Sequence, residues 1–153
     1  VRGTGMAVTT DIGDIRNIHP GNKQDVGKRL ALWALHDAYG KKEVHPSGPL
    51  YVKHEIQGEQ MILSFEHVGR GLASLNKKPL THFTLAGKDR VFHMAEAFIR
   101  DNQIVVQSRR VLKPAATRFA WRDDAQPNFG NLNGLPASPF RTDKWPGKTS
   151  NNR

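Results

Sequence analysis

The spacing of apolar residues changes near residue 50, from a helical period to a period of two. Apolar residues at intervals of three and four predict an amphipathic helix over residues 23–39. Its apolar face would comprise Val26, Leu30, Trp33 and Ala34. Lys28 and Arg29 would then face water, and Gly27 would allow close packing on a sheet. These aromatic and aliphatic side chains are typical of core positions.

Residues that favour helix ends flank this segment. Asn22 can act as the N-cap, and Asp25 follows three residues later, close to a capping box. Gly40 is suited to the left-handed conformation just after a helix. The apolar run 6–8 precedes the helix and predicts a short buried strand. The order strand, loop, helix indicates an α/β element.

Beyond the Pro- and Gly-rich linker 43–49, alternating residues predict short strands bounded by turn signals. The expected strands are 51–56, 61–65, 82–86, 91–99, 104–107 and 116–121. About six such strands predict a small all-β sandwich.

The region after residue 122 is rich in Pro, Gly and Asn, but it also carries Phe129, Leu132, Leu135 and Phe140. A disordered tail seldom holds that many apolar residues, so we expect an extended segment packed on the rest of the protein. The last ten residues would fray. We therefore divide the chain into parts 1–45, 46–122 and 123–153.

The composition is that of a soluble globular protein of 153 residues, with 37% apolar residues and no cysteine. The net charge of +9 comes from 23 scattered Lys and Arg residues, without a basic arm or a nucleic-acid-binding motif. We therefore expect a solvated basic surface and no nucleic-acid partner; steering of an anionic sugar is an alternative. No apolar stretch is long enough for a membrane span.

The segment 10–20 holds the residues best suited to catalysis, because Asp11, Asp14 and His19 share the predicted loop. Such loops collect ligand chemistry in α/β sheets. A histidine with a nearby aspartate is the general-base half of a hydrolase triad. Alternatively, His19 caps or packs the helix start, and Asp11 forms an Asx turn. The other histidines lack metal-ligand spacing, so we expect no metal or cofactor.

Several motifs, in order along nearly the whole chain, resemble the C-terminal part of sialate O-acetylesterases, which are carbohydrate esterases of the SGNH/GDSL hydrolase type. They are the segments 5–14, Ile18-His19-Pro20, 22–32, 47–51, 65–69, 118–121 and 134–143. The resemblance implies the last strand, loop and helix of a flavodoxin-like hydrolase domain, followed by the small β-sandwich. It also implies a secreted or periplasmic location, as in bacteria.

The resemblance further implies that the protein removes acetyl groups from sialic acid or other acetylated sugars. His19 matches the catalytic histidine of the family's Ile-His-Pro motif, and it would act as general base for a serine. In the family an aspartate usually lies three residues before this histidine, where this chain has Arg16. Asp14 is therefore the first choice for orienting His19, and Asp11 is the second.

None of the serines here lies in the family's nucleophile motif. We therefore expect a C-terminal portion of a longer enzyme, whose N-terminal portion carries the nucleophile and which needs no metal. The alternative function is a non-catalytic carbohydrate-binding β-module. Such a module would use exposed Tyr51, Trp121 or Trp145 as a platform for stacking sugars.

Overall fold

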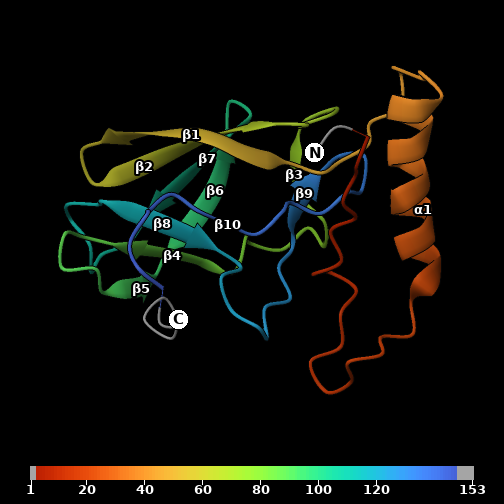
Figure 1. The fold of residues 1–153 in the computed structure, drawn as a ribbon. Helices are drawn as coiled ribbons and strands as arrows, with labels where there is room; N and C mark the ends of the chain where they lie inside the picture. Colours follow the sequence, from red (N-terminus) through yellow and green to blue (C-terminus); the bar gives the residue numbers. More distant parts are fainter. Residues whose placement is uncertain (1–2, 148–153) are drawn as a thin grey trace.

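The computed structural model describes residues 3–147, which form one α-helix and ten strands. The helix α1 (Lys23–Trp33) continues into a π-helical turn, η1 (Ala34–Ala38). The strands are β1 (Leu50–Gln57), β2 (Gln60–Glu66), β3 (Leu72–Ser74), β4 (Phe83–Ala86), β5 (Phe92–Met94), β6 (Glu96–Arg100), β7 (Gln103–Gln107), β8 (Ala116–Phe119), β9 (Phe129–Asn131) and β10 (Phe140–Arg141). The helix and the segment that precedes it lie to one side of the strands (Figure 1).

All strand pairings among the described residues are antiparallel. One four-stranded sheet has the order β1-β2-β7-β6, a second has β10-β8-β4-β5, and β3 pairs with β9. The predicted α/β class is confirmed in this broad sense: the structure is mostly antiparallel sheet with one α-helix. The flavodoxin-like origin of residues 1–45 and the sandwich arrangement stay predictions.

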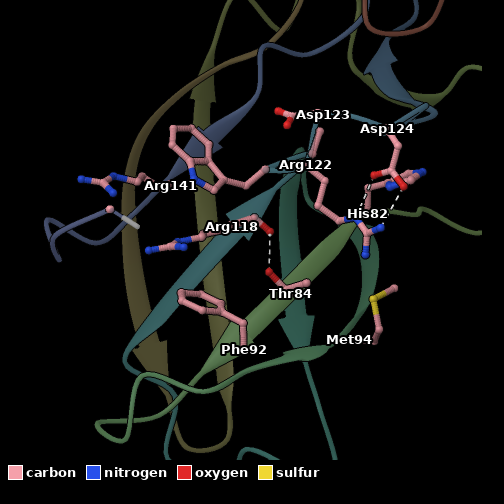
Figure 2. Close-up of a pocket in the computed structure, with 12 residues that line it drawn as sticks. His82, Thr84, Phe92, Met94, Arg118, Arg122, Asp123, Asp124 and Arg141 are labelled. Atoms are coloured by element: carbon pink, nitrogen blue, oxygen red, sulfur yellow. Dashed lines mark hydrogen bonds and ion pairs between the residues drawn. The ribbon is translucent and has the colours of Figure 1, made fainter. Parts of the chain in front are cut away.

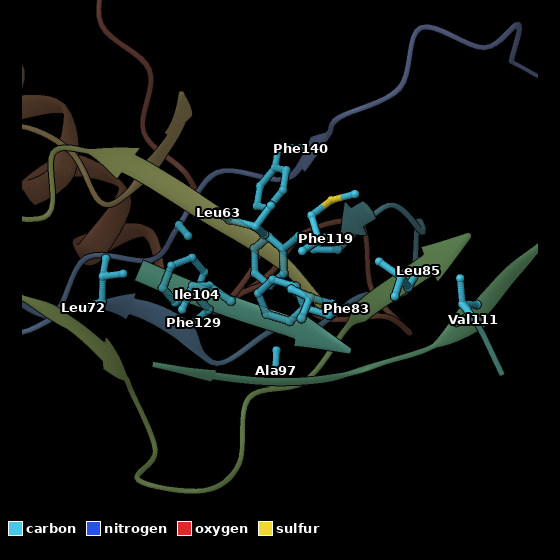
Figure 3. Packing of buried hydrophobic residues seen from close by; sticks show 14 residues of the cluster. Leu63, Leu72, Phe83, Leu85, Ala97, Ile104, Val111, Phe119, Phe129 and Phe140 are labelled. Carbon is cyan, nitrogen blue, oxygen red and sulfur yellow. The ribbon is translucent and has the colours of Figure 1, made fainter. Parts of the chain in front are cut away.

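The core draws on both four-stranded sheets. Met61 and Leu63 of β2 are fully buried in the same cluster as Phe83 of β4 and Phe119 of β8. Figure 3 shows the rings of Phe83, Phe119, Phe129 and Phe140 gathered among the strands. The ring centroids of Phe83 and Phe119 are 4.7 Å apart, within the range of favourable aromatic pairs. This cluster holds the sheets together.

The segment 123–147 is more than an extended strip on the surface. It contributes β9 and β10, and Phe129 and Phe140 lie in the core. The buried Asn128 side chain binds backbone groups of Thr81 and Pro79, which satisfies polar atoms that a longer strand would have paired. Such side-chain pairing explains why the sequence pattern gives no strand signal here.

The expected strand at residues 6–8 does not form, and this prediction was wrong. The backbone there pairs with helix side chains: Trp33 Nε1 donates to the Met6 carbonyl at 2.9 Å, and Arg29 Nη1 donates to the Val8 carbonyl at 2.6 Å. A strand needs a neighbouring edge to satisfy its backbone groups, and side chains of α1 satisfy these two carbonyls instead.

The ends of the helical segment are confirmed. The Asn22 side chain accepts from the Asp25 amide at 3.1 Å, and its amide group donates back to the Asp25 carboxylate at 2.8 Å. The pKa of Asp25 is lowered, and the largest cause is its hydrogen bond with the Asn22 side chain. Gly40 has the positive φ of 67° that a left-handed helix ending requires.

The predicted apolar face of the helix was wrong in part. Arg29, expected to face water, is buried, whereas Leu30 is 49% exposed. No atom lies within 4 Å of a Cβ placed on Gly27, so no close packing occurs at that position. The buried face of the helix carries Arg29, which binds the Asp11 carboxylate of the preceding loop. Leu30 therefore faces solvent.

Candidate functional site

The loop between Thr9 and Gly21 runs beside α1 and is built from tight turns (Figure 1). The Ile12 amide donates to the Thr9 carbonyl at 3.1 Å, and the Asn17 amide donates to the Asp14 carbonyl at 3.2 Å. The His19 amide donates to Asn17 Oδ1 at 2.9 Å. These turns replace a regular element, so the loop is shaped by its own short polar side chains.

Asp11 anchors this loop to the helix. Its two carboxylate oxygens accept from Arg29 Nη1 and Nη2, both at 2.7 Å. A bidentate pair of this kind fixes both orientation and distance. Because Arg29 occupies both oxygens, the structure gives Asp11 a tethering role and not a free carboxylate.

Asp14 remains more available. Its Oδ1 accepts from the Arg16 amide at 2.9 Å in an Asx turn, and Oδ2 accepts no hydrogen bond from residues 3–147. The residue is exposed, so its side chain can rotate without leaving a buried partner unsatisfied.

His19 lies on the exposed face of the loop, and its imidazole makes no hydrogen bond within residues 3–147. The neighbouring Ile18 is 90% exposed. The structure thus places Asp11, Asp14 and His19 on one loop but joins neither carboxylate to the imidazole. An accessible imidazole can act as a general base once a proton donor and an orienting acceptor lie within hydrogen-bond reach.

Large apolar side chains are exposed on the loop and the helix. They are Met6, Ile15, Ile18 and Leu30. Exposed apolar side chains that form one contiguous patch mark surfaces that other protein covers.

A second feature is a pocket of about 1230 Å³ on the β10-β8-β4-β5 sheet, which sequence reasoning did not find. Figure 2 shows Thr84, Phe92, Arg118 and Arg141 around it. Its lining comes from several strands and the β8–β9 loop, so no local sequence pattern could identify it. Only Trp121, named as a possible stacking residue, gave a signal.

Ion pairs order the polar side of this pocket. Arg118 Nε and Nη2 donate to Asp143 at 2.8 and 2.9 Å, and its guanidinium carbon lies 4.2 Å from the centre of the Phe92 ring. The hydrogen bond from Arg118 is the largest cause that lowers the pKa of Asp143. Arg141 lies 5.6 Å from the Trp121 ring centre. The guanidinium groups are therefore held in place.

One hydrogen bond connects the two regions. Gln126 Nε2, on the β8–β9 loop that carries Trp121, donates to the Gly13 carbonyl of the His19 loop at 3.0 Å. The β8–β9 loop, which contributes Trp121 to the pocket, thus contacts the candidate catalytic loop.

Residues 3–147 contain no group of three or more histidine, aspartate or glutamate side chains arranged to hold a metal ion. No helix in the same range has the combination of length and apolar character needed to cross a membrane.

Comparison with known proteins identifies relatives. No family profile matches the chain. The chain is 28% identical over 166 residues to the sialate O-acetylesterase of Homo sapiens, which covers 97% of this chain and 31% of the human protein. The crystal structure of a carbohydrate acetylesterase from Xanthomonas citri matches with a TM-score of 0.84 and 40% identity, over 88% of this chain and 31% of that one.

The chain thus spans about a third of the length of both relatives. The two matches agree in chemistry, since both names describe an acetylesterase acting on carbohydrate. The resemblance seen in the sequence is confirmed: the chain is related to the sialate O-acetylesterase-like proteins over part of their length.

Proposed function

We propose that this chain is the C-terminal portion of a serine-type carbohydrate O-acetylesterase that removes acetyl groups from sialic acid or other acetylated sugars. The observation that carries the proposal is the position of His19, exposed in an Ile-His-Pro motif on a loop that is tethered to α1. The related acetylesterases support the class of reaction.

In this proposal the N-terminal portion of the same enzyme supplies the nucleophilic serine. The His19 imidazole takes the serine proton as the hydroxyl attacks the acetyl carbonyl, and returns a proton to the leaving sugar hydroxyl. The acyl-enzyme is then hydrolysed by water, with His19 again as the base. The mechanism uses no metal or cofactor.

Asp14 is proposed to orient His19, because Asp11 is already bound to Arg29 through both oxygens. Asp14 is exposed, and turning its side chain toward His19 would cost one Asx hydrogen bond. The uncovered Ile15, Ile18 and Leu30 favour a docking surface for the N-terminal portion. Such an enzyme would be secreted or periplasmic.

The first test is ester hydrolysis by the isolated chain, with 4-nitrophenyl acetate as substrate. We expect no activity above the buffer rate, because the chain supplies a base without its nucleophile. Robust, saturable hydrolysis by the chain alone would contradict the division of roles. A non-catalytic carbohydrate-binding module, the alternative function, would also be inactive alone, but it would make the longer enzyme indifferent to substitution of His19.

A further inference from the structure

The pocket on the β10-β8-β4-β5 sheet has no role in the His19 chemistry, although it contains an exposed aromatic platform. Trp121 is 50% exposed and follows Ala120, which is buried at a positive φ of 48°. The Ala120 amide donates to the His82 carbonyl at 2.9 Å, so the backbone turns there and directs the next residue to the rim. The indole is therefore held at the surface by its backbone.

Two further apolar side chains line the pocket. Met94 is exposed at the pocket, and Phe92 lines it beneath the Arg118 guanidinium. Ligand sites combine an apolar floor with a few well-placed polar groups. A pyranose ring has the matching shape, because its C–H face is apolar and its edges carry hydroxyl groups.

The polar groups at the rim are planar and paired. Arg122 donates to Asp124 through Nε and Nη2, both at 2.8 Å, and both side chains are well exposed. Such a pair presents donors and acceptors side by side, which matches neighbouring hydroxyls of a sugar. Because these groups are already ordered, binding a ligand immobilises fewer side chains.

The charges balance, despite the positive charge of the whole chain. Arg118, Arg122 and Arg141 line the pocket with Asp123 and Asp124, and Asp143 pairs with Arg118 directly behind it. Three guanidinium groups thus meet three carboxylates. A ligand carrying its own charge would find no net opposite charge, so the balance favours a neutral one.

We propose that this pocket is a binding subsite for a neutral oligosaccharide, with one sugar ring stacked on Trp121 and the hydroxyls of another sugar unit bonded by the Arg122–Asp124 pair. The β8–β9 loop, which contributes Trp121 to the pocket, also contacts the His19 loop through the Gln126–Gly13 hydrogen bond. Binding itself is independent of catalysis; only its benefit to turnover rests on the proposed function.

The test is calorimetric titration of the chain with xylohexaose, a neutral probe, and N-acetylneuraminic acid, a carboxylated one. Xylohexaose is expected to bind, and Trp121→Ala to weaken its binding at least ten-fold with an unchanged circular-dichroism spectrum. The matched control is Tyr39→Ala, which removes an exposed aromatic ring that does not line the pocket and should leave the affinity unchanged.

Arg122→Ala serves as the second variant should Trp121→Ala not fold, since its side chain is largely exposed. It should weaken xylohexaose binding at least three-fold. No xylohexaose binding, or binding that neither variant weakens, would overturn the proposal. Tighter binding of N-acetylneuraminic acid would overturn the assignment of a neutral ligand. His19→Ala should leave binding unchanged, so failure of the catalytic proposal is distinguishable from failure of this one.

Discussion

The two regions of this molecule, residues 3–45 and residues 46–147, bury their apolar side chains to very different extents. The strands enclose Phe83, Phe119 and Phe129 completely. In the N-terminal region the one buried residue of α1 is Arg29, and Leu30 and Ile18 face outward. The strand region has a continuous core, whereas the described part of the N-terminal region is held by the Arg29–Asp11 ion pair and by contacts of Trp33.

This difference indicates that the two regions have different roles. A complete core gives the strands independent stability, so they can support a binding surface such as the Trp121 pocket. None of the described residues 3–45 belongs to that core, which agrees with the proposal that the portion carrying the serine packs on this region. Three substitutions, one pH dependence and one kinetic measurement test the contrast, beginning with the largest expected effect.

Phe119→Ala should produce the largest loss of stability. The ring is fully buried among three other phenylalanines, so its removal should lower the free energy of unfolding by about 3–5 kcal/mol. Denaturant unfolding measures this loss. Leu30→Ala is the matched substitution on the helix and should cost about 0.5 kcal/mol or less, because the side chain is half exposed. Equal losses would remove the contrast between the regions.

Asp143→Asn should have the next largest effect. The Asp143 side chain is 1% exposed and holds Arg118, so its loss leaves a largely buried guanidinium unpaired, at about 3 kcal/mol. The matched substitution Asp124→Asn breaks an exposed pair, and no measurable change in stability is expected. Thermal unfolding of both variants at neutral pH distinguishes them, and comparable losses would contradict the account.

The same pair predicts a dependence on acid. Arg118 lowers the pKa of Asp143 in the folded protein, so the stabilisation is fully present above the ordinary value of 3.8. It is lost as the pH falls below that value and through the lowered pKa, because protonation then favours the unfolded chain. The difference in stability between wild type and Asp143→Asn should shrink over this acid range. A difference that stays constant would exclude the carboxylate charge as its cause.

Arg29→Met should act mainly on the loop, because its partners Asp11 and Val8 lie outside the core cluster of the strands. The substitution removes the bonds to Asp11 and to the Val8 carbonyl, so the turns of the His19 loop should open more often. Amide hydrogen exchange at Ile12, which bonds to Thr9, should become faster. Lys28→Met is the matched control, since Lys28 is exposed and bonds only within the helix. Unchanged exchange at Ile12 in Arg29→Met would show that the tether does not order the loop.

The sequence predicted the features that depend on local chemistry. The Asn22 cap, the ending at Gly40 and most of the longer strands follow from residues close together in the chain. The buried side of α1 could not be predicted in the same way, because it depends on Asp11, 18 residues from Arg29. The sequence did not predict strands β9 and β10, because they are short and pair with strands far away in the chain.

The same distinction between local and distant residues applies to the candidate site. Because the motif around His19 is contiguous, the sequence identified His19, Asp14 and Asp11 as candidate catalytic residues. Whether either carboxylate reaches the imidazole depends on how the loop folds, and the structure commits Asp11 to Arg29. The pocket needs Trp121, Arg141 and Met94 from separate elements, which only the assembled sheet brings together.

The most direct test of the central claim is the kcat of the longer esterase, in which this chain is joined to the portion carrying the serine, for 4-nitrophenyl acetate. His19→Ala is predicted to lower kcat by about 10²–10⁴-fold with an unchanged circular-dichroism spectrum and unfolding temperature. His36→Ala, a histidine in η1 that pairs with Asp37, should leave kcat unchanged. A His19→Ala enzyme that keeps most of its kcat would contradict the claim that this imidazole is the catalytic base.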